Sequence, residues 1–140
     1  INNKGTKSVD YFHKKLGKIM WDYVGMARNE AGLKKAMDEI AQIREEFWKD
    51  VFVPGGMNEL NPELEKAGRV ADFLELGELF AVDALHRNES GGEQEGEAKR
   101  DDVNFKYVAA WEYTGNPREA VLHKEELTFN DIELKQRSYK

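Results

Sequence analysis

Three stretches of the chain repeat apolar residues every three or four positions, which is the spacing of one buried helix face. They predict helices over residues 8–27, 30–51 and 62–87. Ser8 fits the capping position of the first helix, and Asn61 followed by Pro62 fits the start of the third. Short connections between such helices favour an antiparallel three-helix bundle of the spectrin-repeat kind. The predicted core contains Phe12, Leu16, Ile40, Phe47, Leu64, Val70 and Leu74.

The third predicted helix is apolar on more than one side between Phe73 and Phe80. A helix with two apolar faces contacts a neighbour on each of them. We therefore expect this helix to contact a partner beyond its own bundle, and the isolated chain to expose an apolar surface there.

The pattern changes after residue 90. Residues 91–102 combine glycine with glutamate and predict a flexible acidic loop. Apolar and polar residues then alternate along 105–113, which is typical of a strand, and 121–124 predicts a second strand after a turn. The fold class is therefore mainly α: one domain with a bundle at 1–90, the loop at 91–102, and a β-hairpin with an extended tail at 103–140. Because an isolated hairpin is marginally stable, we expect the strand's aromatic face, including Trp111, to pack on the bundle.

Composition narrows the function classes. The chain has 140 residues, 40% of them hydrophobic and 34% charged, which suits one folded domain and excludes disorder. It has no cysteine, which excludes disulfides, cysteine-based metal sites and cysteine nucleophiles. The net charge of −6 is concentrated in the middle of the chain, which argues against a nucleic-acid partner. No apolar run is long enough for a membrane span. The chain begins at Ile1 without a secretory signal, and we expect it to be a piece of a longer polypeptide.

Candidate chemistry is sparse. Asp83 and His86 lie one helical turn apart, which resembles half of a carboxylate-bridged metal site, but a second such motif is missing. Glu75 and Glu78 are interpreted as ordinary acids of an exposed helix face rather than an acid/base pair. The three tryptophans are interpreted as core or interface anchors: Trp21, Trp48 and Trp111. The residues alone thus predict no catalytic, cofactor-binding or metal site in this chain.

Several segments together resemble one known family, the flavoprotein subunit of fumarate reductase and succinate dehydrogenase. The matching part of that family is its C-terminal helical domain with the trailing segment. L-aspartate oxidase shares this domain type and is the nearest alternative. The segments that carry the resemblance are Gly17 to Asn29, Gly32-Leu33, Phe73 to Leu79, Arg87-Asn88-Glu89-Ser90 and Gln136 to Tyr139.

This resemblance implies a division of labour. In the family, FAD is held by an upstream flavin-binding domain, and the residues of hydride and proton transfer also lie upstream. The parent subunit would be an oxidoreductase, and this chain would be an inactive structural and interface domain without a cofactor. Its partners would be the flavin-binding domain and the iron–sulfur subunit. It would reach the bacterial inner membrane on the cytoplasmic side only through other subunits. Arg87, Glu89 and Ser90 would be motif or interface residues.

Two other functions remain open from the sequence. One is a free-standing helical adaptor that binds a partner through its apolar stripe, and the other is a small metal-dependent hydrolase or oxidase built on Asp83 and His86. The family pattern continues after Ser90 with a histidine and a second arginine, which are missing here. Three explanations compete: a natural shortening, an engineered one, or residues that are absent and closed up in the numbering. We favour the last and expect a Cα–Cα distance well above about 3.8 Å at one junction between Ser90 and Gly96.

Overall fold

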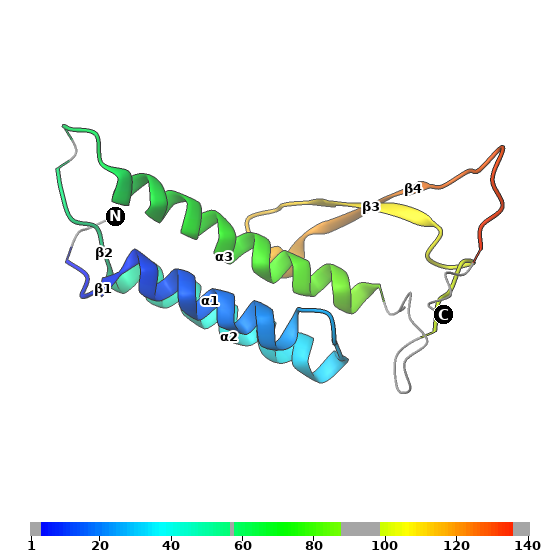
Figure 1. Ribbon diagram of the computed structural model, residues 1–140, viewed down its shortest axis with the longest axis horizontal. Helices are drawn as coiled ribbons and strands as arrows, with labels where there is room; N and C mark the ends of the chain where they lie inside the picture. Colours follow the sequence, from blue (N-terminus) through cyan, green and yellow to red (C-terminus); the bar gives the residue numbers. More distant parts are fainter. Residues whose placement is uncertain (1–3, 57, 88–98, 136–140) are drawn as a thin grey trace. The chain divides into compact units, whose positions relative to one another are not determined.

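The computed structural model describes residues 4–56, 58–87 and 99–135 of the chain. They form two compact units, Ile1–Leu85 and His86–Lys140. The first unit contains the long helices, and the second contains the β-hairpin (Figure 1).

Three helices make up most of the first unit: α1 (Val9–Tyr23), α2 (Glu30–Asp50) and α3 (Pro62–His86, whose last residue belongs to the second unit). Their starts are fixed by side-chain caps. The oxygens of Ser8, Asn29 and Asn61 accept hydrogen bonds from the backbone N–H three residues ahead, at 3.2, 2.8 and 3.1 Å. The helices lie lengthwise side by side (Figure 1), which confirms the predicted bundle.

The first helix ends earlier than predicted, at Tyr23 instead of residue 27. The backbone at Gly25 leaves no room for a side chain, since a Cβ there would lie 2.9 Å from the carbonyl oxygen of Trp21. Glycine close behind the last turn is a common helix stop. The apolar repeat continues to Ala27, but the helical backbone conformation ends at Tyr23.

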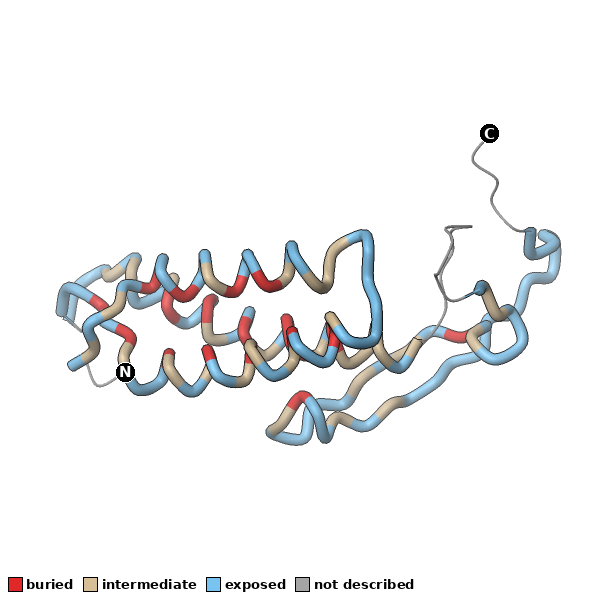
Figure 2. Tube along the Cα trace, turned by 90° about the horizontal axis from the view of Figure 1, so that it is seen from below, coloured by how far each residue is buried: buried red, intermediate tan, exposed pale blue. Residues whose placement is uncertain are grey.

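The core lies between the helices and follows alternating steps of three and four residues (Figure 2). This 3.5-residue period keeps one seam of each helix facing its neighbours, as in coiled coils. Six of the seven predicted core residues are buried. The buried seam positions are Val9, Phe12, Leu16 and Ile19 in α1, Leu33, Ala36, Ile40, Ile43 and Phe47 in α2, and Ala67, Val70, Leu74, Gly77 and Ala81 in α3.

The prediction that Leu64 belongs to the core is wrong, because its side chain is 40% exposed. Counted backwards from Val70 and Ala67, the alternating steps arrive at Glu63, which is half-buried. Leu64 is one position further along and is therefore rotated by about 100° from the seam.

A short parallel pair of strands, which the sequence pattern did not predict, joins the start of α1 to the end of α2. β1 (Lys7–Ser8) pairs with β2 (Val51–Phe52), with Lys7 opposite Val51. The preceding Gly5 passes so close to α2 that a Cβ would lie 2.2 Å from the carbonyl oxygen of Asp50. The close approach therefore requires glycine at this position.

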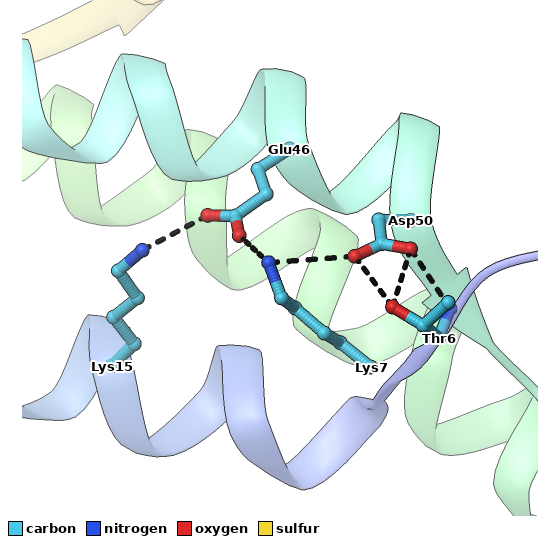
Figure 3. Close-up of polar contacts among 5 residues, drawn as sticks. All are labelled: Thr6, Lys7, Lys15, Glu46 and Asp50. Carbon is cyan, nitrogen blue, oxygen red and sulfur yellow. Dashed lines mark hydrogen bonds and ion pairs between the residues drawn. The ribbon is translucent and has the colours of Figure 1, made fainter.

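Polar side chains reinforce this end of the bundle (Figure 3). Thr6 donates to the Asp50 carboxylate from its backbone N–H at 2.8 Å and from its hydroxyl at 2.9 Å. Lys7 forms ion pairs with both Glu46 and Asp50, and Lys15 binds Glu46 at 2.9 Å. The hydrogen bond from Lys7, and after it the one from Lys15, lowers the pKa of Glu46. The hydrogen bond from the backbone N–H of Thr6 lowers the pKa of Asp50.

These shifts predict a loss of stability in acid. A carboxyl whose pKa is lower in the folded state stabilises the fold above its unfolded pKa of about 4, and this contribution is lost as the pH falls through the folded pKa. The variant Glu46→Gln should therefore be less stable than the parent chain at neutral pH. The difference should be smaller at about pH 3, because protonation of Glu46 increases as the pH falls towards its lowered pKa.

Urea unfolding at the two pH values, followed by circular dichroism, measures this difference. Glu45→Gln is the matched control, because the Glu45 side chain is 75% exposed and pairs only loosely with Lys49 at 3.5 Å. A stability difference for Glu46→Gln that stays constant between the two pH values would contradict the prediction.

The second unit contains the predicted hairpin. β3 (Tyr107–Glu112) pairs antiparallel with β4 (Val121–Glu126), from Tyr107 opposite Glu126 to Glu112 opposite Val121. The connection holds Gly115, at φ +102°, and a 3₁₀ turn (Pro117–Glu119) capped by Asn116. Positive φ is the conformation that favours glycine, and this explains the turn cluster seen in the sequence.

The two faces of β3 differ as the alternation predicts. Tyr107, Ala109 and Trp111 are buried or half-buried, and the residues between them are exposed. The expected packing of this face on the bundle stays a prediction. The expected break after Ser90 and most of the expected loop fall on residues 88–98, outside the described residues.

Candidate functional site

Arg87, the first residue of the family-like motif, is bound to the hairpin. It follows α3 directly, and its Nη2 donates to the carbonyl oxygens of Phe105 at 3.2 Å and Tyr107 at 2.8 Å. One side chain thus contacts two backbone acceptors that lie two residues apart at the start of β3. Hydrogen bonds from a charged donor are stronger than those between neutral groups. Arg87 therefore orders the beginning of the strand.

Aromatic rings surround this contact. The guanidinium carbon of Arg87 lies 5.2 Å from the ring centre of Tyr107 and 6.0 Å from that of Phe105. Lys124 on β4 places its Nζ 4.5 Å from the Tyr107 ring centre. Tyr107 is only 6% exposed, so these cation–π contacts are partly shielded from water.

His86 completes the group, which we call the Arg87 cluster: His86, Arg87, Phe105, Tyr107, Trp111 and Lys124. Nε2 of His86 lies 3.2 Å from the Tyr107 hydroxyl oxygen, within hydrogen-bond distance. The same imidazole meets the Trp111 ring edge to face, with 5.6 Å between the ring centres. The cluster is a packing and hydrogen-bonding arrangement around the start of the strand.

In this arrangement the His86 imidazole is engaged by Tyr107 and Trp111. Within the residues that the structure describes, no group of three histidine or acidic side chains is placed to hold a metal ion. The other histidines lie elsewhere. His13 packs 6.0 Å from Phe73, measured between ring centres, and His123 binds Glu112 at 2.7 Å.

The interpretation of Glu78 as an exposed acid is wrong. Its side chain is fully buried in the bundle and forms an ion pair with Arg44 of α2. Glu75, three residues earlier, is half-buried. The contact between Glu78 and Arg44 links α3 to α2, so it belongs to the structure of the bundle rather than to an acid/base pair.

The tryptophans are placed differently from one another. Trp21 is 86% exposed and Trp48 is 58% exposed, so neither is a core residue, and only the interface interpretation remains for them. Trp111 is half-buried in the Arg87 cluster.

The second apolar face of α3 is exposed as predicted. Phe73, Leu76 and Phe80 are 43, 49 and 62% exposed. Their spacing of three and four residues repeats the step of the buried seam, so they form a second seam on the same helix. We call these three residues the outer stripe. None of the helices in the part of the chain that is described is both long and apolar enough to cross a membrane.

Comparison with known proteins explains this combination of a bundle, an arginine motif and a hairpin. The family model described as "Fumarate reductase flavoprotein C-term" matches residues 13–139. The chain belongs to this family. The model runs from within α1 to the end of the tail, so both units are parts of the family's domain. Of the motif residues, Arg87 lies in the described part, and Glu89 and Ser90 lie outside it.

Individual relatives agree with this assignment. A fumarate reductase flavoprotein subunit of Proteus vulgaris is 28% identical over 140 residues, which cover 96% of this chain and 22% of the relative. An uncharacterized FAD-dependent oxidoreductase of Methanocaldococcus jannaschii is 36% identical over 89 residues, which cover 64% of this chain and 15% of the relative. The chain thus spans about a fifth of the length of the curated relatives it matches.

Solved structures share the fold. A quinol-fumarate reductase with menaquinol molecules superposes with a TM-score of 0.79 at 23% identity, over 95% of this chain and 23% of that chain. The Sdh1 complex of Mycobacterium smegmatis gives a TM-score of 0.67 at 26% identity, over 92% of this chain and 22% of that chain.

Proposed function

We propose that this chain is the C-terminal helical domain of a flavoprotein subunit that interconverts fumarate and succinate, and that it contains no active site itself. The family match over residues 13–139 supports the first part. The second part rests on the resemblance to the family, in which FAD and the residues of hydride and proton transfer belong to an upstream domain. The relatives that align with 82 and 96% of this chain are fumarate reductase flavoprotein subunits, which favours this reaction over that of L-aspartate oxidase.

In the proposed subunit, FAD is bound by a separate flavin-binding domain, and electrons pass between the flavin and a quinone through an iron–sulfur subunit. The present chain supports the flavin-binding domain and offers a surface to it or to the iron–sulfur subunit. It meets the membrane only through other subunits, on the cytoplasmic side of a bacterial inner membrane.

The observation that carries the interface role is the outer stripe. Three large apolar side chains on one helix face are costly to leave in water, at about 25 cal/mol for each Å². Their seam spacing suits a neighbouring structural element that lies along α3. A purely solvated helix would carry charged residues at these positions.

Two measurements test the proposal. The purified 140-residue chain should show no visible flavin absorbance and should not reduce fumarate with an artificial electron donor. The full subunit should absorb as a flavoprotein and should reduce fumarate. Flavin bound to the chain alone, or turnover by it, would overturn the proposed absence of an active site.

The interface role is tested in the full subunit. Phe80→Ser in the outer stripe should weaken assembly or lower its thermal midpoint, because it removes apolar contact area with the partner. In the isolated chain the same change should leave stability nearly unchanged, since Phe80 is exposed there. Leu60→Ser in the connection before α3 is the control, because Leu60 is 95% exposed and lies outside the outer stripe. Equal behaviour of Phe80→Ser in the subunit and in the isolated chain would contradict the interface role.

A further inference from the structure

The two strands of the hairpin differ in charge. β3 contains an uncharged run from Tyr107 to Trp111, whereas β4 contains three consecutive charged residues, Lys124, Glu125 and Glu126. Charged side chains discourage the addition of another strand at a sheet edge. An uncharged run of strand-forming residues without proline invites it. The edge of β3 therefore needs a protection that its own side chains do not supply.

The backbone bonds show which groups face that edge. The N–H of Leu127 donates to the carbonyl oxygen of Lys106 across the hairpin at 3.2 Å. In an antiparallel ladder, residues whose backbone groups point to the partner strand alternate with residues whose groups point away. Because Lys106 points towards the second strand, the carbonyls of Phe105 and Tyr107 point to the outer edge.

These two outward carbonyls are the ones to which Arg87 donates. We propose that Arg87 closes the outer edge of β3 against the β3 strand of a second copy of this chain. The Phe105 carbonyl already accepts the backbone N–H of Tyr107 at 2.9 Å. The acceptor that an added strand would use is therefore the Tyr107 carbonyl, and the guanidinium of Arg87 already occupies it at 2.8 Å. The second copy's uncharged run is the strand that would pair, since it can extend the ladder without placing charges side by side. The motif arginine thus keeps the hairpin from pairing between molecules.

Amide hydrogen exchange in the 140-residue chain tests this role, with Arg87→Ala compared with the parent at low and high protein concentration. Ala109 is the reporter, because by the same alternation its N–H points to the outer edge of β3. In Arg87→Ala, exchange at Ala109 should slow severalfold as concentration rises, together with an increase in molecular mass. In the parent, exchange at Ala109 should not depend on concentration. Association through the outer stripe of α3 would leave Ala109 unchanged.

Three controls make the result decisive. Arg69→Ala removes an arginine of α3 that pairs with Glu65 in the same helix, and should have no effect at Ala109. Leu122 on the outer edge of β4 should stay unchanged in every variant. Arg87→Lys keeps the charge but not the planar fork, and should give a weaker form of the same effect.

Two results would overturn the proposal. One is exchange at Ala109 that is independent of concentration in both Arg87 variants. The other is faster exchange at Val108, whose N–H points to β4, in both variants at low concentration. That result would show that Arg87 only holds the hairpin together.

Discussion

Replacing Arg44 with methionine should lower the free energy of unfolding by about 3–5 kcal/mol, which is the usual cost of removing one partner of a buried ion pair. The reason lies in its partner. The Glu78 side chain is fully buried, whereas Arg44 is 21% exposed. Removal of the guanidinium leaves a carboxylate in the bundle without that countercharge. Urea unfolding followed by the helical circular dichroism signal measures the loss.

Arg69→Met is the matched control. It removes an arginine that pairs with Glu65 one turn away, and both side chains are more than half exposed, at 68 and 64%. Such a surface pair contributes about 0.3–0.5 kcal/mol. The double variant Arg44→Met with Glu78→Leu should recover most of the stability, because it removes the buried carboxylate together with its arginine partner. Equal losses for Arg44→Met and Arg69→Met would contradict the role assigned to the buried pair.

Phe47→Ala should cost about 3–5 kcal/mol, as expected for a large aromatic side chain removed from a closed core. Phe47 is fully buried at the last seam position of α2, and its ring meets Phe12 edge to face, with 5.2 Å between the ring centres. Truncation therefore leaves a cavity next to a second aromatic ring, and neither α1 nor α2 can close it without moving its whole seam.

The next residue supplies the comparison. Trp48 is larger than Phe47 but 58% exposed, and its ring meets the Phe47 ring edge to face. Trp48→Ala should cost about 1 kcal/mol, the value of such an aromatic contact. In thermal and urea unfolding, Phe47→Ala should therefore lose more stability than Trp48→Ala, although phenylalanine is the smaller side chain. A larger loss for Trp48→Ala would show that the seam is wrongly placed.

The fold could be predicted in outline because the helical seams are local patterns. Apolar residues three and four positions apart must share a helix face, so Phe12, Ile40 and Phe47 were identified as core residues without any knowledge of the partner helices. The same pattern misplaced Leu64, because an apolar residue beside the seam looks like a member of it. The end of α1 was also misjudged, because periodicity does not reveal a backbone that turns at Gly25.

The candidate site was less predictable, because its contacts join residues far apart in the sequence. Glu78 is buried and pairs with Arg44 on another helix, and a single helix pattern cannot show that pairing. The bonds from Arg87 go to backbone carbonyls 18 and 20 residues away, which leave no trace in residue types. The resemblance to a family marked Arg87 as important, but the structure was needed to show what it contacts.

The parallel pair of β1 and β2 also bears on how this bundle can change in evolution. Lys7 lies beside Val51, so the chain enters and leaves the α1–α2 hairpin on neighbouring strands, about 4.8 Å apart. The helix pair α1–α2 therefore forms a hairpin whose two open ends lie side by side. Whole heptads can be inserted at its far tip, around residues 24–29, or deleted from it, without displacing the chain on either side. Length variation among related bundles is therefore expected to be concentrated at that tip.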